Sequence, residues 1–181
     1  MSVLVVAENW NGNFKKSTYE AVSYANEIAK QLGITTTALS IGNVSNDALQ
    51  ALGKYGASKV ISATHEKLSD FNVQAYAGVI AEVTKKEGAQ LLVFSNTFAG
   101  KSLSPRVAVK LGAGMVTDAM ALPSSINPFT VKRKIFSGKA FANVVLTTDV
   151  KILALAPNSF HLVEVPTTLT IDNFTPNIND A

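Results

Sequence analysis

From the N-terminus to about residue 120, short apolar runs alternate with longer amphipathic stretches, and no other feature constrains the fold as strongly. The apolar runs have the length of buried strands, and five strands are expected: Val3–Ala7, Ile34–Ile41, Lys59–Ala63, Ala89–Ser95 and Met115–Leu122. Strands that are apolar almost throughout are typical of a sheet covered on both faces. The alternation therefore predicts right-handed βαβ units, with a parallel sheet between two layers of helices.

Four amphipathic helices are expected between these strands, over residues 17–32, 45–52, 73–83 and 104–111. The first helix is predicted to begin at a capping box, in which Ser17 and Glu20 satisfy backbone N–H groups reciprocally. The fourth is predicted to begin at Ser104, with Pro105 in the first helical position.

The pattern changes after Leu122. Two apolar stretches, Phe129–Phe136 and Ala140–Leu146, flank Ser137-Gly138 and predict a hairpin, and Lys151–Ala156 predicts one more strand. From Thr167 onward the chain is polar and rich in Asn and Thr, which indicates a connector or loose tail. We therefore expect an α/β domain over residues 1–166, followed by a connector over residues 167–181.

The composition excludes several classes of protein. Hydrophobic residues make up 47% of the chain and charged residues 16%, which excludes a disordered chain and indicates that a partner covers part of the surface. A formal net charge of +3 is too small for a dedicated nucleic-acid binder. Because the chain has no Cys, disulfides, iron–sulfur ligation and thiol catalysis are excluded.

No apolar run approaches the ~18 residues of a transmembrane helix, so no membrane insertion is expected. The N-terminal segment MSVLVVAEN starts directly as a strand and has no basic stretch of the kind that opens a secretory signal. A cytoplasmic protein is predicted.

Residues Ser95–Ser102 read SNTFAGKS and follow a strand, as a phosphate-binding P-loop does. However, Ser95 stands where the motif requires glycine. The helix start expected at Ser104 would also leave Lys101 and Ser102 in the preceding loop. An ATP-hydrolysing P-loop is therefore not expected.

A weaker anion or nucleotide site at the same loop stays a candidate. Backbone N–H groups around Gly100 and the start of the following helix could hold an anion. Glu8 and Ser95 close two strands and could line a crevice there, because ligands gather at the carboxyl ends of strands in such sheets. The equally weighted alternative is that the nearby cations, Lys101 and Arg106, extend into solvent.

Positive charge is concentrated in one part of the chain. Between Lys101 and Lys139 there are seven basic residues and one acidic residue. Lys132, Arg133 and Lys134 follow one another on a predicted strand, so Arg133 should face away from its neighbours. This cluster is either a solvated edge strand or, together with Arg106, a docking surface for an acidic partner.

No catalytic or metal-binding residues are expected. The two histidines, His65 and His161, lie almost a hundred residues apart, and neither has further ligands at a metal-binding spacing. No Ser lies in a nucleophile-elbow sequence, so a catalytic triad is not predicted either.

Several segments together resemble the N-terminal domain of the electron transfer flavoprotein α subunit. The most specific segment is Gly100–Ala119, similar to the family's Gly-Lys-x-Leu-x-Pro-Arg-x-Ala helix and the Asp-bearing strand after it. The other segments that carry the resemblance are VLVVAEN, Glu20-Ala21-Val22, Tyr55–Val60, KIFSGKAFANVVL and ALAPNSF. The fold class expected is α/β: a Rossmann-like three-layer sandwich of the adenine-nucleotide α-hydrolase type, with a mostly parallel sheet and C-terminal antiparallel strands.

The resemblance also implies a function. Such proteins are αβ heterodimers that accept electrons from acyl-CoA and other dehydrogenases and pass them to a membrane quinone oxidoreductase. FAD is held mainly by a C-terminal domain of the α subunit, outside the residues present here, and AMP sits in the β subunit. The N-terminal domain packs against the β subunit, so no cofactor is expected on this chain alone.

Two alternatives stay open at this point. One is a stand-alone adenine-nucleotide-binding module of the universal-stress type, favoured by the parallel sheet and the Gly100-Lys101-Ser102 loop. The other, ranked last, is a small nucleotide-dependent enzyme, which would need an acid, base or metal that the sequence does not suggest.

Overall fold

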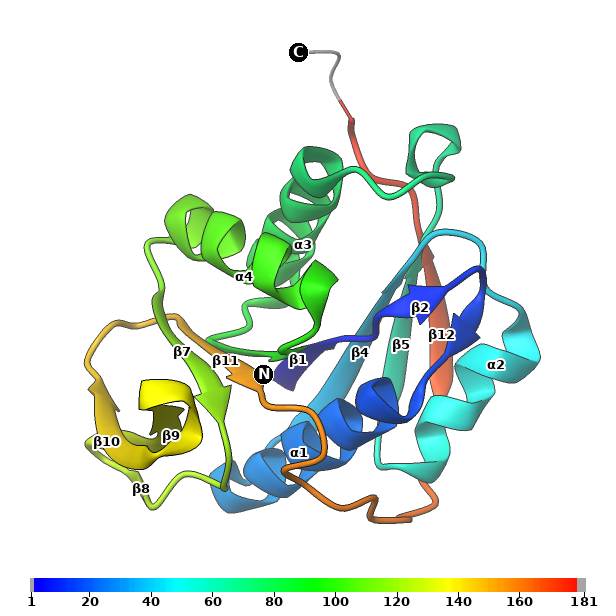
Figure 1. Cartoon of the computed structure of the whole chain (residues 1–181). Helices are drawn as coiled ribbons and strands as arrows, with labels where there is room; N and C mark the ends of the chain where they lie inside the picture. Colours follow the sequence, from blue (N-terminus) through cyan, green and yellow to red (C-terminus); the bar gives the residue numbers. More distant parts are fainter. Residues whose placement is uncertain (1, 179–181) are drawn as a thin grey trace.

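Seven adjacent strands run parallel in a ten-stranded mixed sheet in the computed structural model, which describes residues 2–178 (Figure 1). The spatial order is β10-β9-β7-β11-β6-β1-β4-β5-β12, with β8 paired to β9. The parallel strands are β1 (Ser2–Val6), β4 (Thr35–Ile41), β5 (Lys59–Ala63), β6 (Leu91–Ser95), β7 (Gly114–Ala119), β11 (Lys151–Leu155) and β12 (Thr170–Phe174). The predicted α/β class with a mostly parallel sheet is confirmed.

The antiparallel strands lie at one end of this sheet (Figure 1). They are β8 (Ser125–Ile126), β9 (Phe129–Ile135) and β10 (Ala140–Leu146). The short helix η3 (Phe136–Gly138) joins β9 to β10, and the two strands pair along their whole length. The predicted hairpin is therefore present. A small second hairpin, β2 (Asn9–Trp10) with β3 (Asn13–Phe14), was not predicted.

Helices cover both faces of the sheet (Figure 1). One face carries α1 (Lys16–Leu32), α2 (Asn46–Ala51) and η1 (Leu52–Lys54), and the other carries η2 (Glu66–Leu68), α3 (Val73–Glu87) and α4 (Phe98–Leu111). Side chains of one strand alternate between the two cores: Val3 and Val5 of β1 face α1, whereas Leu4 faces α3 and α4. None of the helices within residues 2–178 has the length and apolarity needed to cross a membrane.

The first helix does not begin at the predicted capping box. Helix α1 begins at Lys16, and its N-cap residue Lys15 makes no side-chain capping bond. The backbone carbonyl of Ser17 instead accepts a hydrogen bond from Ser95 Oγ at 2.9 Å. Glu20 is buried and accepts the backbone N–H of Asn158 at 3.0 Å, and not a backbone N–H at the helix start as a capping box requires. Tertiary contacts have replaced the local cap.

The start predicted for the fourth helix is also wrong. Helix α4 begins at Phe98, where the N-cap Thr97 accepts the backbone N–H of Gly100 through its Oγ1 at 3.1 Å. Ser104 and Pro105 lie inside the helix. A residue that can cap was available earlier in the chain, so the Ser-Pro pair does not mark the first turn.

The polar C-terminal segment contains a strand that was not predicted. Thr170–Phe174 forms β12, which pairs in parallel with β5 along its whole length. Ile171 packs against the core under α1, and Phe174 packs against the core under α3 and α4. The expectation of a loose tail is wrong for these residues, because two apolar side chains on opposite faces attach the segment to the sheet edge. Residues 179–181 of the expected connector lie outside the described residues.

Two helical glycines give a matched test of this packing. A Cβ added at Gly78 in α3 meets no atom within 4 Å, whereas one added at Gly100 in α4 lies 1.8 Å from the backbone oxygen of Ser95. Gly78→Ala should raise the free energy of unfolding by about 0.5–1 kcal/mol, because glycine is a poor helix former. Gly100→Ala should lower it by about 1–3 kcal/mol through overpacking. Urea unfolding measures both, and equal shifts in the same direction would contradict this packing.

A second prediction concerns alkaline pH. Tyr24 of α1 is fully buried and donates its hydroxyl to the carbonyl of Ala121 at 2.8 Å, and burial raises the pKa of its phenol. Because the folded pKa exceeds the unfolded value of about 10, this contribution to stability is complete below that pH and is lost as the pH rises.

Tyr24→Phe should cost about 1 kcal/mol near neutral pH and should lose less stability than the wild type between about pH 9 and about pH 11. Unfolding free energies measured across that range check this expectation. Parallel curves for the two proteins would show that Tyr24 does not cause the alkaline loss.

Candidate functional site

The topological switch point of the sheet lies between β1 and β6. From β1 the chain continues to β4 on one side, and from β6 it continues to β7 in the other direction. In open α/β sheets, the crevice outside the carboxyl ends of such strands is the usual ligand site. The structure places Glu8, which follows β1, and Ser95, which ends β6, at this edge of the sheet.

The polar groups at the ends of β1 and β6 form hydrogen bonds within the chain. Thr97 Oγ1 donates a hydrogen bond to the carboxylate of Glu8. The backbone carbonyl of Glu8 accepts a hydrogen bond from Thr18 Oγ1, and Ser95 Oγ donates to the carbonyl of Ser17. These hydrogen bonds attach the start of α1 to the ends of β1 and β6. The polar groups involved are therefore already bonded within the chain.

The loop that resembled a P-loop has a different geometry from the one predicted. Lys101 and Ser102 lie in the first turns of α4 and not in a loop before it, because the helix begins at Phe98. The backbone N–H of Gly100 already donates to Thr97 Oγ1, and the backbone N–H of Lys101 already donates to the carbonyl of Thr97. Lys101 is exposed, and Ser102 Oγ donates to the carbonyl of Phe98 at 3.0 Å.

Packing explains why residue 100 is a glycine. Its Cα approaches the end of β6 so closely that no side chain fits beside the carbonyl of Ser95. The close contact between helix and strand therefore accounts for this glycine without a bound phosphate. The role of Glu8, Ser95, Gly100, Lys101 and Ser102 in holding an anion stays a prediction.

Two polar contacts near the switch point, each with one buried partner, were missed by sequence reasoning. Asn96 is 3% exposed, and its Nδ2 donates to Asp118 Oδ1 at 2.6 Å. Asp118 has a positive φ of 55° at an irregularity in the pairing of β7 with β11. A single acidic residue within an apolar strand was the available signal for this contact.

The second missed contact is an ion pair on α1. The carboxylate of Glu20 is 1% exposed and lies 3.2 Å from Lys16 Nζ, which also donates to Asn158 Oδ1. These bonds join α1 to the loop after β11. The polar groups around the switch point thus connect neighbouring elements of the fold.

The three consecutive basic residues of β9 separate onto two faces, as the alternation predicted. Arg133 faces inward, and its Nη2 donates to Thr117 Oγ1 of β7 at 3.0 Å. Lys132 and Lys134 face the other way, on the same side of the hairpin as Phe141. The Nζ of Lys132 lies 4.7 Å from the centre of the Phe141 ring. Arg106 is exposed on α4, a separate element.

We call the surface formed by Lys132, Lys134, Phe141 and Val145 the outer hairpin face. Phe141 is 53% exposed and Val145 is 49% exposed, and Phe136 at the tip of the hairpin is 76% exposed. The hairpin sequence from residue 129 to residue 146 contains no acidic residue. Exposed aromatic and aliphatic side chains that lie together on one surface are typical of a site that binds another protein.

Comparison with known proteins gives a consistent result. A family model described as the electron transfer flavoprotein domain matches residues 3–177. The chain is 30% identical to the electron transfer flavoprotein subunit alpha of Bacillus subtilis (strain 168) over 168 residues, which is 91% of this chain and 50% of the relative. The resemblance identified from the sequence is confirmed.

Two further relatives are subunits with other names. The chain is 28% identical to the acryloyl-CoA reductase electron transfer subunit beta of Anaerotignum propionicum, over 70% of this chain and 35% of the relative. It is also 28% identical to lactate dehydrogenase (NAD(+),ferredoxin) subunit LctC of Acetobacterium woodii, over 79% of this chain and 34% of the relative. The chain thus spans half or less of the length of these curated relatives.

The contacts at the switch point give a third prediction. Thr97→Val removes the hydroxyl that caps α4 and leaves the partly buried Glu8 carboxylate without its donor. Unfolding free energy should fall by about 1–3 kcal/mol. Ser102→Ala is the matched control on the same helix and should change it by less than about 0.5 kcal/mol. An unchanged midpoint for Thr97→Val in thermal unfolding would show that the cap does not hold this edge together.

Proposed function

This chain belongs to the electron transfer flavoprotein family, and from that premise we propose that it is the N-terminal scaffold domain of an α subunit. The match over residues 3–177 is the observation that supports the proposal most strongly. Together with a β subunit, such a protein would carry electrons from acyl-CoA and other dehydrogenases to a quinone oxidoreductase through FAD. The cytoplasmic location stays a prediction.

We place the flavin outside this chain in the proposal, because the residues at the switch point do not fit a dinucleotide. The Glu8 carboxylate stands at the crevice, and Gly100 packs against the end of β6. The N–H groups of Gly100 and Lys101 are already bonded, so the phosphate-cradling loop of dinucleotide-binding sheets is not formed here. The proposal therefore assigns FAD mainly to a further domain of the α subunit and AMP to the β subunit.

The outer hairpin face is the surface that we propose for the β subunit. The side chains of Phe141 and Val145 would supply the apolar area that an obligate interface needs, since aromatic anchors carry much of the binding energy in protein complexes. Lys132 and Lys134 would steer an acidic partner surface into place. Arg133 would contribute indirectly, because its bond to Thr117 fixes the hairpin against β7.

The fourth prediction tests this surface. The 181-residue chain mixed with a cognate β subunit should form a complex in gel filtration at micromolar concentration. Phe141→Ser combined with Lys132→Glu should weaken binding by at least about tenfold in calorimetry, because an aromatic anchor is lost and a charge is reversed. Arg106→Glu on α4 is the matched control and should leave the affinity unchanged.

Two outcomes would contradict the proposal. If the purified proteins elute only as separate species, the scaffold assignment fails. If this chain alone carries flavin stoichiometrically, as an absorption spectrum would reveal, the assignment of the flavin to another domain fails.

A further inference from the structure

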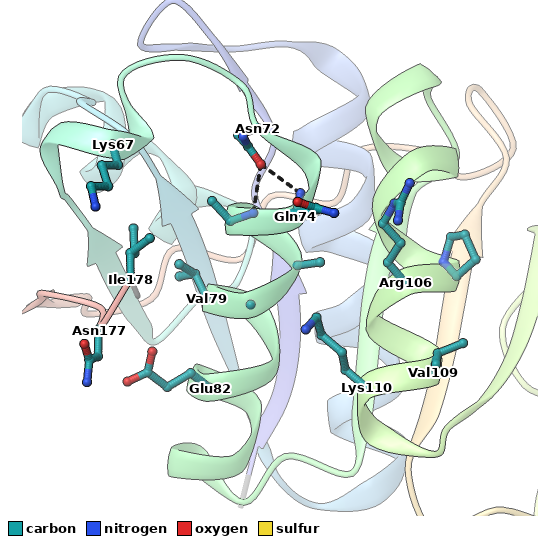
Figure 2. A pocket seen from close by; sticks show the side chains of 14 residues that line it. Lys67, Asn72, Gln74, Val79, Glu82, Arg106, Val109, Lys110, Asn177 and Ile178 are labelled. Atoms are coloured by element: carbon teal, nitrogen blue, oxygen red, sulfur yellow. Dashed lines mark hydrogen bonds between the residues drawn. The ribbon is translucent and has the colours of Figure 1, made fainter. Parts of the chain in front are cut away.

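A groove of about 930 Å³ lies over α3, on the face of the sheet opposite α1 (Figure 2). Helix α3 forms its floor, α4 forms one wall, and Asn177 and Ile178 border the other side. We call it the α3–α4 groove. The residues on which the argument depends are Gly78 and Glu82 of α3 and Pro105, Arg106, Val109 and Lys110 of α4.

The wall formed by α4 is positively charged. Helix α4 contains three basic residues and no acidic residue from Phe98 to Leu111. Arg106 and Lys110 lie one turn apart along the groove, and within residues 2–178 neither takes part in an ion pair. Glu82, the acidic residue of the lining, lies on the side of α3 that faces Asn177 and Ile178 (Figure 2). The cations of α4 therefore have no acidic counterpart of their own.

The floor of the groove allows close approach. Gly78 lies in the middle of α3, and the space where its Cβ would be is open. The fold thus gives no packing reason for a glycine, although glycine disfavours a helix interior. Val109 of α4, which also lines the groove, is 85% exposed and can contact an apolar side chain. The groove offers an apolar contact and room for another backbone.

These features select one kind of occupant. A second copy of this chain is disfavoured, because two α4 walls would bring like charges together. An elongated groove between helices suits an amphipathic helix, which lays its apolar face on the floor. Residues four positions apart on a helix have Cβ atoms about 6 Å apart. Two acidic residues at this spacing on a partner helix would therefore match Arg106 and Lys110 of α4.

We propose that the α3–α4 groove binds an acidic amphipathic helix of a partner protein, whose carboxylates pair with Arg106 and Lys110 and whose apolar face packs on Gly78 and Val109. This surface is separate from the outer hairpin face, and the inference does not depend on the proposed function.

The experiment uses the 181-residue chain and a fluorescein-labelled synthetic helical peptide of 15 residues, the length of α3. One face of the peptide carries Ala and Leu, and Glu occupies every fourth position along the edge of that face. Fluorescence anisotropy should show binding that weakens as salt is added, because the pairs are exposed. Two control peptides accompany it: one with Lys in place of Glu, and one with the same charge but a central proline that prevents the helix.

Four variants locate the peptide. Arg106→Gln combined with Lys110→Gln should weaken binding about tenfold. Gly78→Leu should weaken it at least as much, because its side chain enters the groove; circular dichroism checks that the variant is folded, and Gly78→Ala serves as a smaller change at the same position. Lys132→Gln combined with Lys134→Gln, on the outer hairpin face, should leave the affinity unchanged.

Several results would overturn the inference. Absence of binding by the acidic helix would do so, as would equal binding of the lysine peptide. Equal binding of the proline peptide would indicate a general attraction for polyanions and not for a helix. Loss of affinity in the Lys132→Gln, Lys134→Gln variant would place the peptide on the outer hairpin face. Unchanged affinity in folded Gly78→Leu would place the peptide outside the α3–α4 groove. Binding of the β subunit should be unchanged in Gly78→Leu, so this inference and the proposed function can fail separately.

Discussion

The complete burial of β1 is the constraint on which the rest of the structure depends. Successive side chains of this strand enter opposite cores, so each face of the sheet needs a covering layer of helices. Right-handed connections then place α1 and α2 on one face and α3 and α4 on the other. This arrangement creates the switch point between β1 and β6, where the N-terminal ends of α1 and α4 meet.

At that switch point the chain uses polar groups for its own cohesion. The Thr97–Glu8 and Ser95–Ser17 hydrogen bonds tie two helices to two strands, and Gly100 lets α4 come into close contact with β6. Many related sheets hold a nucleotide at this position. Here the polar groups at the same position form hydrogen bonds within the chain. The two surfaces that we propose for partner binding lie elsewhere: the outer hairpin face at one end of the sheet, and the α3–α4 groove.

Whether a segment could be predicted from the sequence depends on whether local patterns or contacts distant in sequence determine its structure. Buried strands such as Lys59–Ala63 and the hairpin around Ser137-Gly138 were predicted because their apolar pattern is strong and local. The starts of α1 and α4 were not predicted. Helix α1 begins at Lys16 and not at Ser17 because contacts distant in sequence determine its start, and α4 is capped by Thr97, which comes before Ser104 in the chain. The strand β12 was hidden because Ile171 and Phe174 face opposite cores, so neither alternation nor a helical stripe appears. The groove could not be predicted, since it depends on how α3 lies beside α4.

The order of the strands in space has a consequence for synthesis on the ribosome. The central strand β11 is inserted between β6 and β7, and β12 covers the far side of β5, yet both come from the last third of the chain. A nascent polypeptide that ends before Lys151 therefore exposes unpaired backbone along three strands at once. Because such edges attract other chains, the nascent polypeptide is prone to aggregation until the segments that form β11 and β12 emerge.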